Sequence, residues 1–212
     1  MSTTMTAEAA SNAAIWAAAE RELGYVPGGP INIGWHCSDR ICRSGRAGKA
    51  ALIWEDHRGQ ERRYTFDDLR VLSNSIAAFL LGQGLRPGDR ICLFMERIPE
   101  LYIAFLGILK MGGIAQPLFS AFGEESLLTR LSDAGTAAVL TQTKHVSKVR
   151  KIRASLPELR HVVVVDAGEG PLREHETAMA MGRLPRVDEF EVFPTTAETP
   201  SVLHYTSGTT GQ

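Results

Sequence analysis

Residues 90–118, RICLFMERIPELYIAFLGILKMGGIAQPL, contain two short apolar runs that flank a longer apolar segment. The run 90–94 predicts a buried strand, and 114–118 predicts a second, short strand. The segment between them, 100–110, has the length and composition of an apolar helix, which Gly112-Gly113 ends. Two strands joined by a helix are typical of parallel neighbours, because these need a crossover connection.

The same alternation continues on both sides of this unit. It predicts further strands at 50–54, 137–141, 162–165 and 201–205, and further helices at 7–23, after Thr65, at 124–134 and at 146–156. Continuous apolar strands separated by helices indicate an α/β fold with a doubly wound parallel sheet flanked by helices. We expect strands 91–94, 137–141 and 162–165 to share this sheet. Residues 166–200 contain four prolines and are predicted to be mostly loop.

Residues 1–30 are predicted to form an N-terminal helical arm and linker, with the main body at 31–212. The Ala-rich segment 7–23 has strong helix propensity, and the sequence VPGGP at 26–30 is typical of a linker. The first residues lack the basic and apolar regions of a secretory signal. The longest apolar stretch, 101–109, has about half the roughly 20 residues that a spanning helix needs, so we expect no membrane association.

The composition limits the classes of partner. The chain carries 23 Lys plus Arg against 24 Asp plus Glu, a formal net charge of -1, and therefore lacks the basic excess of a nucleic-acid-binding protein. Its three cysteines are too few for a disulfide framework, which favours a reducing, cytoplasmic compartment. His36-Cys37 and Cys42 lack a second Cys/His pair at zinc-finger spacing, so zinc is not favoured.

The stretch 206–212, TSGTTGQ, directly follows the last predicted strand and is dense in glycine and hydroxyl residues. Backbone N–H groups in such turns form a concave anion site, and hydroxyls add donors for phosphate or ligands for magnesium. The spacing differs from that of the P-loop, which requires a Gly-Lys pair opening a helix. Composition by itself is equally compatible with a flexible tail.

A second candidate region is the helix predicted at 146–156. No Asp or Glu occurs between Asp133 and Glu158, so this helix and the residues before it are locally basic. The cations either form a solvated face, with valines turned inward, or bind a phosphorylated small molecule.

The sequence YTSGTTG at 205–211 resembles the phosphate loop of the adenylate-forming enzymes, which include acyl-CoA synthetases, luciferases and adenylation domains of peptide synthetases. Residues 64–69, YTFDDL, and 109–118, LKMGGIAQPL, are similar to two further motifs of that family. Within the family the likeness is greatest to the AMP-forming acetyl-CoA synthetases. It rests on Asn32-Ile33 and on matches within 95–101, 117–122 and 130–134.

This resemblance implies an acid–thiol ligase that uses ATP, Mg²⁺ and coenzyme A. A carboxylic acid attacks the α-phosphate of ATP to give an acyl-adenylate and pyrophosphate, and coenzyme A then displaces AMP. The residues implied to hold the ATP phosphates are Thr206, Ser207, Gly208, Thr209, Thr210 and Gly211. Thr209 is implied to lie near Mg²⁺. The coenzyme A nucleotide is implied to lie near 119–123 and 144–150, which makes Lys148 and Arg150 candidates for its 3′-phosphate.

The chain departs from the family pattern by ending at Gln212. In the family the loop lysine, the adenine and acyl pockets and a C-terminal domain with the catalytic lysine follow this point. We therefore expect an incomplete N-terminal part of the large domain, with no catalytic residue and no activity by itself. Two alternatives stay open: a carrier-protein-loading adenylation domain, and a non-catalytic remnant or interaction module.

Overall fold

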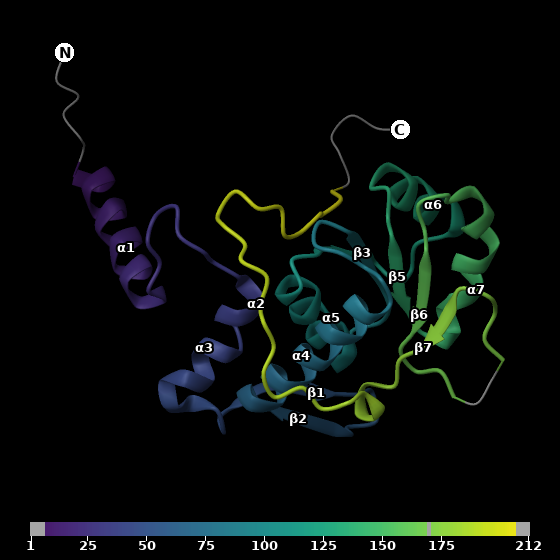
Figure 1. Ribbon diagram of the computed structural model, residues 1–212, viewed down its shortest axis with the longest axis horizontal. Helices are drawn as coiled ribbons and strands as arrows, with labels where there is room; N and C mark the ends of the chain where they lie inside the picture. The colour runs from purple at the N-terminus through teal and green to yellow at the C-terminus, as the bar shows by residue number, and fades with distance from the viewer. Residues whose placement is uncertain (1–6, 169–170, 207–212) are drawn as a thin grey trace, which may run out of the picture.

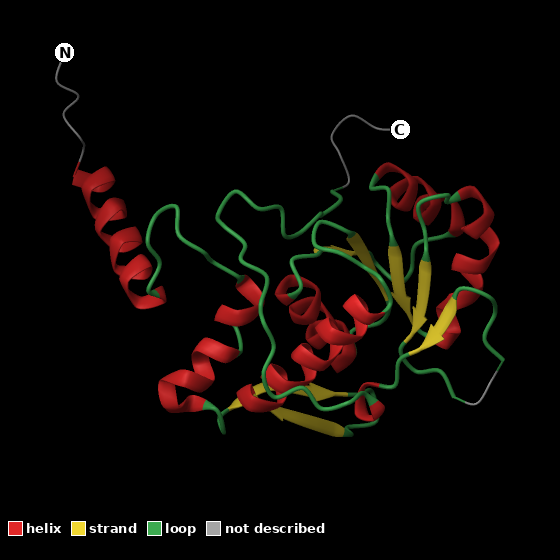
Figure 2. Ribbon diagram, viewed as in Figure 1, coloured by secondary structure: helices red, strands yellow, loops and turns green. Residues whose placement is uncertain are grey.

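The computed structural model describes residues 7–168 and 171–206, and its central feature is a five-stranded parallel sheet (Figures 1 and 2). The strand order is β4-β3-β5-β6-β7, and every neighbouring pair is parallel. The strands are β3 (Arg90–Phe94), β4 (Ile114–Pro117), β5 (Ala138–Thr141), β6 (His161–Val164) and β7 (Glu176–Ala178). The three segments expected to share one sheet are confirmed to do so.

Helices cover both faces of this sheet, as the apolar strands predicted (Figure 2). One face packs against α4 and α5, and the opposite face packs against α6 and α7. These helices are α4 (Phe66–Gly82), α5 (Pro99–Lys110), α6 (Glu124–Asp133) and α7 (Thr143–Ile152), the last followed by the 3₁₀ turn η2 (Arg153–Ser155). In β3, Ile91 and Leu93 face the first layer while Cys92 and Phe94 face the second, because strand side chains alternate between faces.

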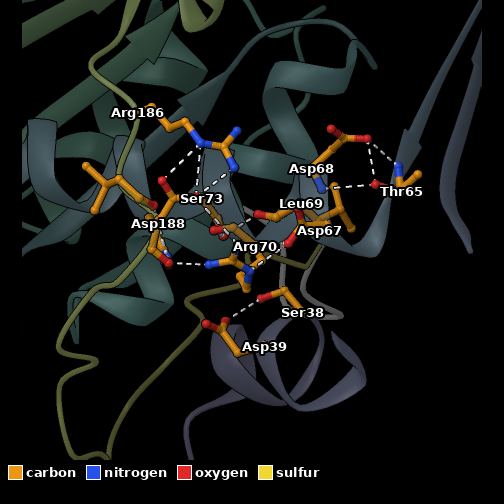
Figure 3. A network of polar contacts seen from close by, with 12 residues as sticks. Ser38, Asp39, Thr65, Asp67, Asp68, Leu69, Arg70, Ser73, Arg186 and Asp188 are labelled. Atoms are coloured by element: carbon orange, nitrogen blue, oxygen red, sulfur yellow. Dashed lines mark hydrogen bonds and ion pairs between the residues drawn. The ribbon is translucent and has the colours of Figure 1, made fainter. Parts of the chain in front are cut away.

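Local sequence accounts for the position of α4. Thr65 accepts a hydrogen bond from the Asp68 backbone N–H at 3.1 Å, and the Asp68 carboxylate accepts one from the Thr65 backbone N–H at 2.8 Å (Figure 3). This reciprocal pair is a capping box, which satisfies two amides that the start of a helix leaves free. Where α4 crosses α5, a Cβ added to Gly107 would lie 2.9 Å from Ile76 Cγ2, so the close approach requires glycine.

Several elements differ from the sequence prediction. The strand at 50–54 forms, as β1 (Ala50–Glu55), but it pairs with β2 (Glu61–Thr65) in a separate antiparallel sheet. Strand β2 was not predicted, because its charged sequence ERRYT lacks an apolar run. The three-residue β7 was not predicted either and lies in the region predicted as loop. The strand predicted at 201–205 is wrong in extent, because Val202 forms a single parallel bridge to Ala115.

The N-terminal region consists of α1 (Ala7–Leu23), α2 (Ile33–His36), α3 (Asp39–Ile41) and the π-helical turn η1 (Cys42–Arg46). The predicted helix at 7–23 is therefore confirmed, whereas the short helices after it were not predicted. Asn32 caps α2 and donates its side-chain amide to the Leu109 carbonyl at 2.7 Å, which fixes this region to α5. The domain boundary after residue 30 stays a prediction. None of the helices within the described ranges is long and apolar enough to cross a bilayer.

The chain segment that follows the 3₁₀ turn η3 (Met181–Arg183) returns across α4 toward the N-terminal region. Arg70 of α4 lies between two carboxylates: its Nη2 is 2.8 Å from Asp67 Oδ1 and 3.7 Å from Oδ1 of Asp188 in the returning segment (Figure 3). Farther along, the backbone N–H of Ile31 donates to the Thr195 carbonyl at 2.7 Å. These polar contacts join three parts of the chain that are distant in sequence.

Candidate functional site

The carboxyl edge of the sheet contains the switch point of its topology. From β3 the chain moves to β4 on one side, whereas from β5, the neighbour of β3 on the other side, it moves on to β6, so the connections that leave β3 and β5 run in opposite directions. The ends of β3 and β5 are tied together by the Thr141 hydroxyl, which donates to the Phe94 carbonyl at 2.7 Å. Ligands of open α/β sheets bind outside the carboxyl ends of strands at such a point.

A cluster of polar side chains lies at this point. The Glu96 backbone N–H donates to Gln142 Oε1 at 2.9 Å, which joins the residues that follow β3 and β5. Glu96 Oε1 lies 3.3 Å from Lys144 Nζ and 3.1 Å from His145 Nε2. Hydrogen bonding to Lys144 is the largest cause that lowers the pKa of the Glu96 carboxyl, so this carboxylate is charged at neutral pH.

Lys148 reaches from α7 to the loop between β4 and α6. Its Nζ donates to the Ser120 carbonyl at 3.1 Å and to the Phe122 carbonyl at 2.9 Å, and it lies 5.5 Å from the Phe94 ring centroid. The segments 119–123 and 144–150, which the resemblance assigned to one ligand, therefore meet. Phe119 in this loop is 67% exposed and presents an aromatic face to solvent.

Arg150 contacts a different part of the molecule. Its Nε and Nη2 donate to the two carboxylate oxygens of Glu176 on β7, each at 2.7 Å. This bidentate pair lowers the pKa of Glu176 and raises that of Arg150. In this structure, Lys148 and Arg150 therefore contact different partners. Their role in binding coenzyme A stays a prediction.

The segment that leads into the glycine- and hydroxyl-rich motif runs beside β4, the edge strand. Ala115 donates its N–H to the Ser201 carbonyl and accepts from the Leu203 N–H, both at 2.9 Å. Because the Val202–Ala115 bridge is parallel, this segment approaches the same edge of the sheet as the ends of β3 and β5. Thr206 is exposed. The other predicted phosphate-binding residues, Ser207, Gly208, Thr209, Thr210 and Gly211, lie outside the described residues, as does the magnesium assignment of Thr209.

Sequence reasoning missed three polar residues at this edge. Gln142 comes directly after β5, and Glu96 and Asp166 are the second residues after β3 and β6. Asp166 Oδ1 accepts hydrogen bonds from the Thr143 N–H at 2.6 Å and hydroxyl at 3.0 Å, and so holds the start of α7. Their position in the sequence could have identified them, because each of these polar residues lies within two residues of the end of a predicted strand, where ligands of α/β sheets bind.

The chain is similar in sequence to one protein family and to known enzymes. Residues 40–212 match the model of the AMP-binding enzyme family. The acetyl-coenzyme A synthetase of Bacillus subtilis is 33% identical over 207 residues, which cover 92% of this chain and 34% of that protein. The 3-hydroxypropionyl-coenzyme A synthetase of Sulfurisphaera tokodaii is 30% identical over 204 residues, 89% of this chain and 30% of that protein.

Solved structures agree with these relatives. The crystal structure of an acyl-CoA synthetase from Brucella canis superimposes with a TM-score of 0.79 at 27% identity, over 92% of this chain and 34% of that one. The chain thus spans about a third of the length of the proteins it matches. The family model accounts for the sheet, its flanking helices and the final motif together. On this evidence the chain belongs to the AMP-binding enzyme family.

Proposed function

We propose that this chain is the N-terminal third of an AMP-forming acid–CoA ligase whose acid is acetate or another short-chain carboxylate. The whole protein would convert the acid, ATP and coenzyme A to acyl-CoA, AMP and pyrophosphate. The membership of the AMP-binding family supports the adenylation step, and the names of the relatives support a thiol ligase. The three free cysteines favour a reducing, cytoplasmic compartment.

The observation that carries this proposal is the parallel course of residues 201–203 beside Ala115 of β4. This course leads to Thr206, the first residue of the motif, and we expect the motif to lie at the carboxyl edge of the sheet, where backbone N–H groups can meet phosphates. Adenylation brings an anionic acid to an anionic nucleotide, so charge neutralisation is the main demand on the site. The hydroxyls of the motif can donate to phosphate oxygens, and Thr209 is the candidate ligand near Mg²⁺, which would supply the neutralising charge.

The proposal is tested with the full-length protein that contains this chain. We expect acetate, propionate or 3-hydroxypropionate to support exchange of pyrophosphate into ATP, and we expect AMP release on addition of coenzyme A. Exchange followed by acyl transfer to a carrier-protein thiol, but not to coenzyme A, would favour the adenylation-domain alternative. No exchange with any carboxylic acid would contradict adenylation and favour the non-catalytic alternative.

Lys148 and Arg150 provide a more specific prediction. In the full-length enzyme, replacing both with alanine is expected to reduce the preference for coenzyme A over dephospho-coenzyme A by about tenfold or more. The reason is that hydrogen bonds to a charged phosphate are stronger than hydrogen bonds between neutral groups. The ratio of the two Michaelis constants measures this preference.

A matched control separates phosphate binding from structural damage. Glu176→Gln removes the carboxylate that holds Arg150 but leaves both cations in place. We expect this variant to keep the preference for coenzyme A. An unchanged preference in the double alanine variant would contradict the assignment of these two residues.

A further inference from the structure

Arg130 of α6 lies against two aromatic rings that come from different segments. Its guanidinium carbon is 4.5 Å from the centroid of Phe122 and 5.7 Å from the centroid of Tyr205. Phe122 belongs to the loop 119–123, whereas Tyr205 immediately precedes Thr206, the first residue of the predicted phosphate loop. A planar guanidinium stacks on aromatic faces in a way that an ammonium group does not.

The Tyr205 hydroxyl adds a second tie to the same helix. It donates to Asp133 Oδ2 at 2.6 Å, and the Arg130 carbonyl oxygen lies 3.1 Å away. Burial, followed by the hydrogen bond to Asp133, raises the pKa of Tyr205 to about 12, so the phenol keeps its donor proton at physiological pH. The ring and the hydroxyl of Tyr205 are therefore both fixed to α6.

The backbone of Arg130 is in turn fixed to the sheet. Its carbonyl accepts from Gln116 Nε2 at 3.1 Å, and Gln116 is fully buried in β4, where its Oε1 accepts from the Thr136 hydroxyl at 2.6 Å. Arg130 Nη1 donates to the Ser126 carbonyl at 3.0 Å. Arg130 Nε is buried and has no hydrogen-bond partner among the described residues, as expected of a group held mainly by stacking.

The loop 119–123 is thus held from two sides. Lys148 binds the carbonyls of Ser120 and Phe122 from α7, and Arg130 covers the Phe122 ring from α6. On its other side, Arg130 meets the segment that leads to Thr206. Arg130 therefore contacts both aromatic rings.

We propose that Arg130, supported by Asp133, is a positioning residue that couples the loop 119–123 to the start of the phosphate loop. The two segments then move together, so that ordering of one by its ligand orders the other. This inference rests on the proposed function for the identity of the two ligands, coenzyme A and ATP. The coupling itself is a property of the described residues and can be measured without ligand.

Amide hydrogen exchange of the 212-residue chain tests the coupling. The reporters are the Phe122 amide, which donates to the Phe119 carbonyl, and the Leu203 amide, which donates to the Ala115 carbonyl. Arg130→Lys keeps the charge but loses the planar stack, and is expected to speed exchange at both amides by about fivefold or more. Amides of β3 and β5 should keep their protection, which shows that the fold is intact.

One control variant and two further substitutions test whether faster exchange at both amides is due to the Arg130 stack. Arg153→Lys changes an arginine that also has a buried, unpartnered Nε but stacks on no ring among the described residues, and it should change neither reporter. Tyr205→Leu should speed exchange at Phe122, and Phe122→Leu should speed exchange at Leu203, because coupling is reciprocal. Acceleration confined to the mutated segment, in either variant, would overturn the inference.

A kinetic measurement in the full-length enzyme separates this inference from the proposed function. Arg130→Lys is expected to raise the KM for ATP and the KM for coenzyme A together, each about tenfold, whereas Arg153→Lys raises neither. A rise in one KM only would contradict the coupling. If the full-length protein shows no adenylation while the exchange cross-effects are present, the proposed function is wrong and the coupling of the two segments stands.

Discussion

Asp39→Asn is expected to lower the free energy of unfolding by about 3–5 kcal/mol at neutral pH, because it leaves a buried ammonium without its counter-charge. Lys110, the last residue of α5, is fully buried, and its Nζ lies 2.6 Å from Asp39 Oδ2. Asn74 Oδ1, also at 2.6 Å, and the Arg70 carbonyl, at 3.3 Å, complete its contacts. Asparagine preserves the size of the side chain, so urea unfolding reports mainly the lost charge.

The loss should depend on pH in a defined direction. Burial is the largest cause that lowers the pKa of Lys110, and removing Asp39 removes a contact that raises it. Between the lowered pKa of the folded state and the unfolded value of about 10.4, the unfolded chain binds more protons. Between the folded-state pKa of Lys110 in the variant and its higher folded-state pKa in wild type, only the folded variant has released this proton, so the stability of the variant relative to wild type rises with pH there. The difference between variant and wild type is the quantity to follow, because cysteines and tyrosines also titrate there.

An exposed ion pair provides the control. Lys151 and Glu124 lie 2.6 Å apart, with side chains that are 65% and 42% exposed. Glu124→Gln is expected to lower the free energy of unfolding by about 1 kcal/mol or less, without recovery at high pH. Equal losses at the two sites, or a loss at Asp39 that does not shrink between pH 7 and pH 9.5, would show that Lys110 is not held as a buried cation.

The second large effect concerns turnover. The 212-residue polypeptide, assayed by itself with acetate, ATP, magnesium and coenzyme A, is expected to release no pyrophosphate above background. From its resemblance to the adenylate-forming enzymes, we expect the neutralising loop lysine, the adenine pocket and the second domain to be contributed by residues outside these 212. One positioned donor to developing charge is worth about 10²–10³ in rate, and the missing positioning groups add several kcal/mol more.

Two measurements check this expectation. Coupled detection of pyrophosphate compares the 212-residue chain with the full-length protein under the same conditions. Titration calorimetry should find weak or no binding of ATP to the shorter chain. Clear acetate-dependent release of pyrophosphate by the 212-residue chain would mean that the active site lies within it and has been assigned to the wrong residues.

Much of the parallel sheet was predictable from the sequence, and the reason is local. Buried strands such as 90–94 place apolar side chains on both faces, so the pattern is visible without knowing the partners. The same rule failed for β2, whose sequence ERRYT is mostly exposed, and for β7, which has three residues. These strands form because an adjacent strand offers backbone groups for hydrogen bonding. A short stretch of sequence does not show which strand will be adjacent.

Some features of the candidate site were likewise predictable from local sequence, whereas others depend on the tertiary structure. The motif 205–211 and the basic residues around 144–150 are visible as composition, and family resemblance assigns them a chemistry. Nothing in the sequence showed that Arg150 is held by Glu176, or that Lys148 binds the carbonyls of the loop 119–123. The resemblance assigned one ligand to two cations that contact different partners in this structure, and that assignment stays a prediction.

By itself, therefore, the sequence determined that apolar strands alternate with the main helices in an α/β fold, because this pattern depends on residues within a few positions of one another. The chemistry of the final motif stays a prediction. The tertiary structure decided the buried Asp39–Lys110 pair and the stack of Arg130 between Phe122 and Tyr205. Asp39 and Lys110 are far apart in sequence, as are Arg130 and Tyr205. The packing of the N-terminal helices on α5 brings the first pair together, and the bridge of Val202 to β4 brings Tyr205 toward α6. The strength of such contacts depends on burial and on the geometry of the partner, which exist only once the sheet has formed.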